Sequence, residues 1–191
     1  MQGASTSTAG SGLQSGSIAA PSTRVTNVNG TIITTITLDL ENLSGSNNPT
    51  GSQVVIGNAE ARADGASPAY LIEWNESLNG NCYRVELSCI ETPVGGAANA
   101  TFCLSGSTLG TYEQDDVPAG DPYAIFGMTG SLSKGTSVSS LGAAGEIETV
   151  STEIADGEFV YMCNQTAGAA GSPGKYTAGK LIFNFYGHKT F

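Results

Sequence analysis

Residues Thr31–Glu41, TIITTITLDLE, decide the fold class of this chain. Their β-branched side chains favour an extended strand. Ile36, Leu38 and Leu40 alternate with polar residues, and successive side chains of a strand point to opposite faces of the sheet. The stretch therefore predicts a strand with one buried face and one face in solvent.

A second alternating stretch lies near the C-terminus. Within Gly179–Tyr186, the apolar residues Leu181, Phe183 and Phe185 are expected on one face, with Ile182, Asn184 and Tyr186 on the other. Glu158–Cys163 alternates in the same way, and a loop rich in small residues, Asn164–Lys175, separates the two. We predict that these two strands form a hairpin.

The clearest local unit is Ala69–Glu91, where two strand-like segments, Tyr70–Ser77 and Asn81–Glu91, flank Asn79-Gly80. Asn-Gly favours a type I′ turn because both residues tolerate positive φ, so the unit predicts a hairpin. Alternation places four residues of the second segment on its core face: Tyr83, Val85, Leu87 and Cys89. Cys82 is then expected on the opposite face, out of reach of Cys89.

Further short strands are predicted at intervals, separated by Gly, Pro and Asn turns. They are Gln53–Ile56, Ala100–Leu104, Tyr123–Phe126 and Glu146–Ile154, with Gly130–Gly145 as a loop or weak edge strand. No helical period lasts longer than a turn or two. Residues 23–191 are therefore expected to form one all-β domain, a β-sandwich, a jelly-roll-like fold or a barrel.

Residues 1–22 consist mainly of Gly, Ser, Ala and Thr. Such a segment buries too little apolar surface to offset its own ordering entropy. We predict an extended arm that lies in a groove of a neighbouring subunit, with Leu13, Ile18 and Pro21 as its contact residues. An arm packed on its own domain is the alternative.

Charge and composition exclude several functions. The chain has 191 residues, 17 Asp and Glu against seven Lys and Arg, and a formal net charge of −10, which repels nucleic-acid phosphates. His188 is the only histidine, whereas acid–base and metal chemistry rely heavily on that residue. We therefore expect that the protein is not an enzyme, holds no cofactor and does not bind nucleic acid. No apolar segment approaches the ~20 residues that cross a bilayer, so no membrane partner is expected either.

The four cysteines, Cys82, Cys89, Cys103 and Cys163, show no CxxC spacing and have no histidine cluster to complete a zinc site. Two disulfides would be possible in an oxidising compartment. The N-terminal segment lacks the basic start and apolar stretch of a secretory signal, so we expect free thiols packed as small hydrophobic groups.

Two groups of carboxylates are candidate sites. Glu113, Asp115, Asp116 and Asp121 lie in one loop and are a weak candidate for Ca²⁺ binding. Asp39 with Glu41, and Glu146 with Glu148, lie two apart on predicted strands, and paired carboxylates can hydrolyse glycosides. Acidic loops and strand faces are more often merely solvated, so neither group is expected to be a site.

Several strings in the chain resemble structural proteins of marine tailed bacteriophages that are encoded among head genes. They are KYTAGKLI (175–182) ending in FYG (185–187), PAYL (68–71), YRVE (83–86), CIETP (89–93) and residues 32–40. The resemblance implies a virion protein, specifically a capsid decoration protein that binds the outer surface of the phage head. It further implies a major capsid protein as partner, a homotrimer by analogy, and assembly in the host bacterial cytoplasm, which suits free thiols.

Three other functions remain open. A tail or fibre component that recognises host glycans would need exposed aromatic residues around Trp74, Tyr112 or Tyr123. A major shell protein with a jelly-roll fold would differ from a decoration protein in its copy number per particle. A glycan hydrolase would need two of the carboxylates across a cleft.

Overall fold

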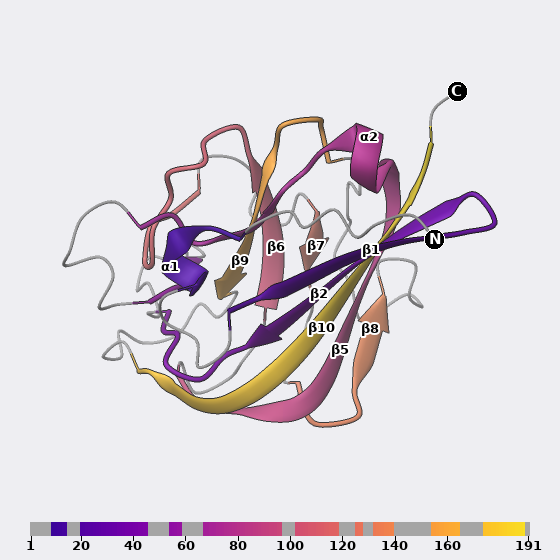
Figure 1. Ribbon diagram of the computed structural model, residues 1–191. Helices are drawn as coiled ribbons and strands as arrows, with labels where there is room; N and C mark the ends of the chain where they lie inside the picture. Colours follow the sequence, from indigo (N-terminus) through magenta and orange to yellow (C-terminus); the bar gives the residue numbers. More distant parts are fainter. Residues whose placement is uncertain are drawn as a thin grey trace.

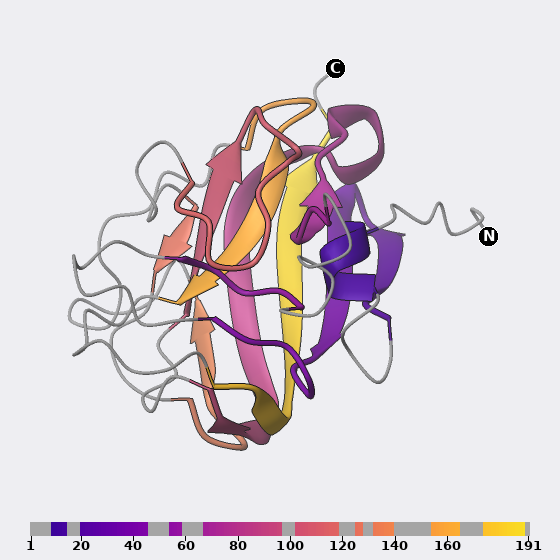
Figure 2. The same cartoon turned by 90° about the vertical axis from the view of Figure 1, so that its left-hand side faces the viewer.

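A computed structural model describes residues 9–14, 20–45, 54–58, 67–96, 102–118, 125–127, 132–139, 154–164 and 174–189. Two antiparallel β-sheets pack face to face, as the two views in Figures 1 and 2 show. The prediction of an all-β sandwich is therefore confirmed. Among the described helices, none is long and apolar enough to cross a membrane.

The first sheet contains the longest strands. Its five strands, in spatial order, are β1 (Ser22–Val28), β2 (Thr31–Asp39), β10 (Tyr176–His188), β5 (Asn81–Gly95) and β8 (Ser137–Ser139). All neighbouring strands are antiparallel. β1 and β8 are its two edges, which agrees with the edge strand predicted within Gly130–Gly145.

The second sheet is smaller. It contains β3 (Val54–Val55), β9 (Phe159–Asn164), β6 (Phe102–Ser107) and β7 (Phe126–Gly127) in that order, and β4 (Tyr70–Glu73) pairs with the other end of β9. Two short helices, α1 (Ser11–Gln14) and α2 (Glu76–Asn79), complete the described elements. The strands predicted at Gln53–Ile56, Ala100–Leu104 and Tyr123–Phe126 thus exist with shifted ends, whereas residues 146–153 lie outside the described residues.

Alternation in the two decisive stretches is confirmed. In β2, Ile36 and Leu38 are fully buried while Thr35 and Thr37 are partly exposed; Leu40, just beyond the strand, is also fully buried. In β10, Leu181, Phe183 and Phe185 are buried between the sheets, and the three residues between and beyond them face outward. Burial of these side chains, worth about 1.5–3 kcal/mol each, holds the first sheet on the second.

The predicted hairpin within Ala69–Glu91 is wrong. β4 pairs with β9 in the second sheet, whereas β5 pairs with β10 in the first. Between them the chain forms α2, whose start is capped by the Asn75 side chain accepting from the Leu78 N–H at 3.1 Å. Asn79 is the last residue of that helix, and Gly80 ends it with φ +73°. The Asn-Gly pair therefore terminates a helix that carries the chain from one sheet to the other.

The predicted C-terminal hairpin is also wrong, because β9 belongs to the second sheet and β10 to the first. β9 is buried on both faces from Val160 to Asn164. Tyr161 contacts the Tyr70 and Tyr112 rings, and its hydroxyl donates to the Leu109 carbonyl at 2.8 Å. β9 is also central in its sheet, because β6 pairs along its full length on one edge and β3 and β4 pair with its two ends on the other.

The faces expected for Cys82 and Tyr83 are reversed. Cys82 is 8% exposed and belongs to the core cluster, whereas Tyr83 is 39% exposed. The register between β5 and β10 shifts where Tyr186 pairs with Arg84 and Gly187 with Cys82, so Tyr83 is the extra residue of a β-bulge. A bulge inverts the alternation on one side of it, and the prediction is correct only after it, for Val85, Leu87 and Cys89.

Candidate functional site

The outer face of the first sheet, defined as the side chains that point away from the second sheet, is a polar surface whose side chains form hydrogen bonds between strands. The strand register aligns these side chains in cross-strand rows. One row is Arg24, Thr35, Asn184, Glu86 and Ser139, and the next is Ser22, Thr37, Ile182, Ser88 and Ser137. Most of these side chains are short, so few of them project far from the sheet.

Hydrogen bonds between neighbouring strands fix several of these side chains. The Thr35 hydroxyl donates to the Asn184 side-chain oxygen at 2.8 Å, joining β2 to β10. The hydroxyls of Ser88 and Ser137 are 3.1 Å apart and join β5 to β8. Cross-strand pairs of this kind stabilise a sheet and limit the rotamers of the paired side chains.

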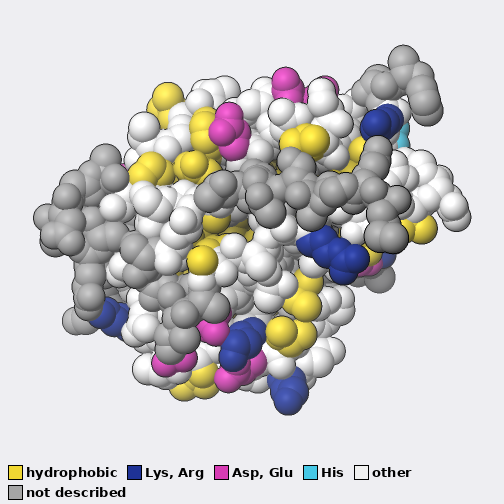
Figure 3. Space-filling model, viewed as in Figure 1, with side chains coloured by type: hydrophobic (Ala, Val, Ile, Leu, Met, Phe, Trp, Pro, Cys, Tyr) yellow, Lys and Arg dark blue, Asp and Glu magenta, His cyan; other side chains and the backbone are white. Residues whose placement is uncertain are grey.

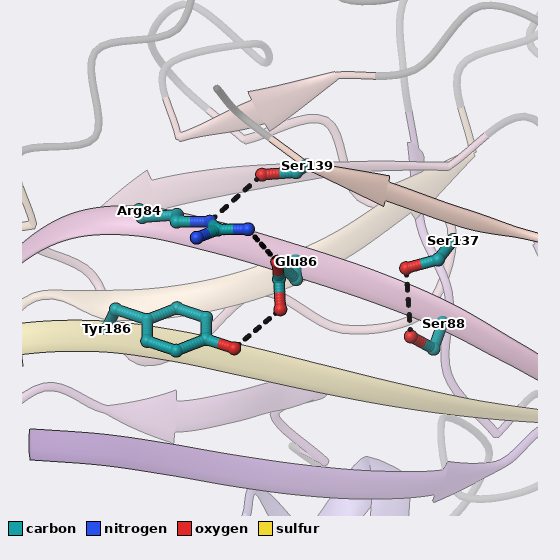
Figure 4. A network of polar contacts seen from close by, with 6 residues as sticks. All are labelled: Arg84, Glu86, Ser88, Ser137, Ser139 and Tyr186. Atoms are coloured by element: carbon teal, nitrogen blue, oxygen red, sulfur yellow. Dashed lines mark hydrogen bonds and ion pairs between the residues drawn. The ribbon is translucent and has the colours of Figure 1, made fainter. Parts of the chain in front are cut away.

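Glu86 is the centre of a larger network, drawn in Figure 4. One carboxylate oxygen accepts from the Arg84 guanidinium, and the other accepts from the Tyr186 hydroxyl at 2.5 Å. Arg84 Nε also donates to the Ser139 hydroxyl at 3.2 Å, and its guanidinium carbon lies 5.1 Å from the centre of the Tyr186 ring. The network therefore ties β8, β5 and β10 together on the outer face.

The electrostatics of this network favour a protonated Tyr186 hydroxyl beside the Arg84–Glu86 ion pair. Burial raises the pKa of Tyr186, and the hydrogen bond to Glu86 raises this pKa further. The guanidinium and the carboxylate form an ion pair that is partly exposed, so solvent screening keeps its contribution small. Both carboxylate oxygens of Glu86 accept hydrogen bonds, so the Arg84, Glu86 and Tyr186 side chains hold one another in place.

We expect Glu86→Ala to lower the free energy of unfolding by ~1 kcal/mol, because it removes two charge-assisted hydrogen bonds from a partly exposed site. Chemical denaturation measures the change, and Glu41→Ala is the control, with an expected change within ~0.5 kcal/mol. The folded-state pKa of Tyr186 is raised. The contribution of its protonated hydroxyl to the free energy of unfolding is therefore complete below the ordinary tyrosine pKa of about 10 and is lost as the pH rises further. Equal stabilities of Glu86→Ala and the unmodified chain would contradict the network.

Charges on the outer face balance one another. Lys180 lies 3.6 Å from Asp39 and 3.0 Å from Glu91, and these contacts, the hydrogen bond to Glu91 first, raise its pKa. The described charges of this face are three basic and three acidic residues: Arg24, Arg84, Lys180, Asp39, Glu86 and Glu91. The formal charge of −10 is therefore carried by other parts of the molecule.

Exposed acidic side chains lie instead at the end of the sandwich near α2. Glu73, Glu76 and Asp156 are exposed there, and Asp156 accepts from the Glu76 backbone N–H at 2.9 Å.

Figure 3 shows one face of the molecule, on which charged side chains are sparse and hydrophobic ones form small separate groups. Most of the described surface on that face is uncharged and polar or backbone.

The described part of the predicted arm packs on its own domain. Leu13 in α1 is fully buried in the core cluster. The N–H groups of Gly10 and Gly12 donate to the carbonyls of Tyr70 and Pro68 at 2.9 and 2.8 Å. This placement corrects the expectation that Leu13 contacts a neighbouring subunit. Ile18 lies outside the described residues, and Pro21 is half-buried immediately before β1.

In the acidic loop, two of the weak candidate ligands for calcium accept hydrogen bonds from the backbone instead. Glu113 accepts from the Ser67 N–H at 2.9 Å, and Asp116 accepts from the Glu113 N–H at 2.8 Å. Within the described ranges, no three His, Cys, Asp or Glu residues form a group that could hold a metal ion. Asp115 has φ +66° in this loop, and Asp121 lies outside the described residues.

The other candidate residues do not come together in one site. Asp39 accepts from the Glu41 backbone N–H at 3.1 Å and faces Lys180, while Glu146 and Glu148 lie outside the described residues. Trp74 is fully buried and Tyr112 packs against the core, so neither provides the exposed aromatic cluster that a glycan site would need. Tyr123 is outside the described residues.

Sequence reasoning missed the Arg84–Glu86–Tyr186 network because its members meet only through strand pairing. Glu86 and Tyr186 are 100 positions apart in the chain. Alternation placed Glu86 and Tyr186 on outward faces, which was the only signal available. No known family model matches the sequence, and neither curated proteins nor solved structures give a match.

Proposed function

We propose that this protein is a structural component of a virion, namely a decoration protein that binds the outer surface of a phage head through the outer face of its first sheet. The supporting observation is that this face is balanced in charge and that its side chains are held in place by cross-strand hydrogen bonds. The resemblance to phage head proteins supports the same assignment from the sequence.

The fixed side chains of the outer face reduce the cost of docking. Association normally loses the rotamer entropy of each side chain that becomes ordered at an interface, about 0.5–1.5 kcal/mol per flexible side chain. The Thr35–Asn184 and Ser88–Ser137 pairs and the Glu86 network are already ordered, so less of this entropy remains to be lost. Copies that also contact one another would gain further through effective concentration.

The charge distribution gives the docked protein an orientation. A balanced face meets a protein surface without the net repulsion that a charge of −10 would otherwise produce. The acidic end with Glu73, Glu76 and Asp156 would remain in solvent and keep decorated particles apart from one another. The partners under this proposal are a major capsid protein and further copies of this chain, as a homotrimer, assembled in the host cytoplasm.

Ile182→Glu tests the docking face, because Ile182 lies in the middle of it between Thr37 and Ser88. A buried, unpaired carboxylate costs several kcal/mol at an interface, so we expect binding to weaken at least about 100-fold. Cosedimentation of the purified protein with heads that lack it measures the affinity. Ser77→Glu, on the exposed surface of α2, is the matched control and should bind normally.

We expect Ile182→Glu to fold, because the substituted side chain is partly exposed on the outer face. Circular dichroism checks this. Equal binding of Ile182→Glu and the unmodified chain would remove this face from the proposal. Labelling of intact particles supplies the second test: signal on the head surface supports a decoration protein, whereas signal on the tail supports the glycan-binding alternative.

A further inference from the structure

Cys103 and Cys163 lie directly opposite each other in the second sheet. They are register partners in the antiparallel pair β6–β9, and both side chains are fully buried. The Cys103 thiol donates to the Cys163 carbonyl at 3.7 Å. The neighbouring Cys103 side chain and burial raise the pKa of Cys163.

The other two cysteines provide an internal comparison. Cys82 and Cys89 both lie on β5 and donate to carbonyls of their own strand, those of Arg84 at 3.6 Å and Glu91 at 3.2 Å. Their cross-strand partners are Gly187 and Leu181, not thiols. The structure thus brings one pair of cysteines together out of the six pairs that four cysteines allow.

We propose that Cys103 and Cys163 are a site of intramolecular disulfide formation. Directly opposed residues of antiparallel strands have Cβ atoms about 4.5–5.5 Å apart, and a disulfide needs about 3.5–4.5 Å. A small local shift of β6 against β9 therefore closes the bond. No rearrangement of the sandwich is required.

The oxidant is a low-molecular-weight disulfide such as oxidised glutathione, and the reaction is thiol–disulfide exchange. One cysteine, as its thiolate, attacks a sulfur of the reagent, forming a mixed disulfide and releasing one reagent thiolate. The second cysteine thiolate attacks the protein sulfur of the mixed disulfide, forming the Cys103–Cys163 bond and releasing the second reagent thiolate. Two electrons pass to the reagent, and the two protons from the cysteines end on the two reagent thiols.

Burial controls when this exchange happens. Both thiols are shielded from solvent, and the raised pKa of Cys163 keeps its thiolate scarce. The exchange therefore occurs while the second sheet is open, during transient unfolding in an oxidising medium, since the reducing host cytoplasm of the proposed function keeps thiols free. The bond would link positions 60 residues apart, and cross-linking a segment of that length limits the unfolded chain and stabilises the folded one.

The test uses the full chain, refolded in buffers that contain either reduced glutathione alone or a mixture of reduced and oxidised glutathione. Peptide mapping by mass spectrometry, with and without reductant, identifies the linked peptides. We expect one linked pair, Cys103 with Cys163, at two hydrogen masses below the sum of the free peptides. We also expect a higher melting temperature for the oxidised protein than for the reduced one.

Single substitutions assign the effect. Cys103→Ser should remove both the linked peptide and the difference in melting temperature, whereas Cys82→Ser, the matched control, should keep both. Mapping of the unmodified chain does not depend on any variant folding. Free Cys103 and Cys163 after refolding with the oxidant, or a linkage that involves Cys82 or Cys89 instead, would overturn the proposal. Neither result bears on head binding, because the outer face belongs to the other sheet.

Discussion

Replacement of Trp74 with alanine is expected to lower the free energy of unfolding by about 3–5 kcal/mol. Trp74 is fully buried immediately after β4, and its ring lies 5.6 Å from that of Phe185 on β10. Its indole N–H donates to the Gly80 carbonyl at 3.1 Å. One side chain thus joins the second sheet, the first sheet and the end of α2, and alanine would leave a cavity between them.

Far-ultraviolet circular dichroism during urea denaturation measures this change, since Trp74 is the only tryptophan and fluorescence is lost with it. Trp74→Phe separates the two contributions, because it keeps an aromatic ring and removes the hydrogen bond, and its expected cost of about 1–3 kcal/mol is smaller. Leu109→Ala, at a side chain that is 52% exposed, is the control. A cost for Trp74→Ala as small as that of Leu109→Ala would show that Trp74 does not join the sheets.

The faces of the central strands could be predicted from the sequence because they follow from a period of two residues. Apolar residues recur at every second position in Ile36–Leu40 and in Leu181–Phe185, and the structure buries the residues that this period indicates. β2 and β10 lie inside the first sheet, where one face meets the core and the other meets solvent. Alternation fails at Tyr83, since a bulge depends on the pairing of β5 with β10 and leaves no local signal.

Strand partners could not be predicted from the sequence. Both predicted hairpins join strands that are consecutive in the chain, yet each crosses from one sheet to the other. In a sandwich, consecutive strands can pair within a sheet or cross the core, and a turn sequence such as Asn79-Gly80 fits both. Here the burial of Trp74 between the sheets competes with a hairpin turn at Asn79-Gly80, and it directs the chain from the second sheet to the first.

The candidate site was predictable only as a polar face. Sequence alternation assigned Asn184, Tyr186 and Glu86 to outward-facing positions, but their contacts depend on the order β2-β10-β5-β8. The carboxylates of the acidic loop attract attention in the sequence because four of them lie within nine residues. In the structure, Glu113 and Asp116 accept hydrogen bonds from the backbone, a use that local composition does not distinguish from ion binding.

The N-terminal arm yields a prediction opposite to the one that its composition suggests. A Gly/Ser-rich arm that reaches onto a neighbouring subunit could be deleted without unfolding its own domain. Leu13, however, is fully buried in the core, and Gly12 accepts from Asn58 at 2.9 Å besides donating to Pro68. A side chain at Gly10 or Gly12 would also overlap the carbonyl oxygen of Pro68 or Ser67, so α1 sits close against the loop before β4.

We therefore expect Leu13→Ala to lower the free energy of unfolding by ~2–5 kcal/mol, and deletion of residues 2–14 to cost at least as much. The two arrangements of the arm differ in how this loss depends on protein concentration. A leucine in the core of its own domain costs the same at every concentration, whereas a leucine docked on a neighbour stabilises more as subunits associate. Urea denaturation of Leu13→Ala and the unmodified chain over a hundredfold range of concentration distinguishes them. Gln14→Ala, at an exposed position next to Leu13, controls for disturbance of α1, and a loss that grows with concentration would place Leu13 on a neighbouring subunit.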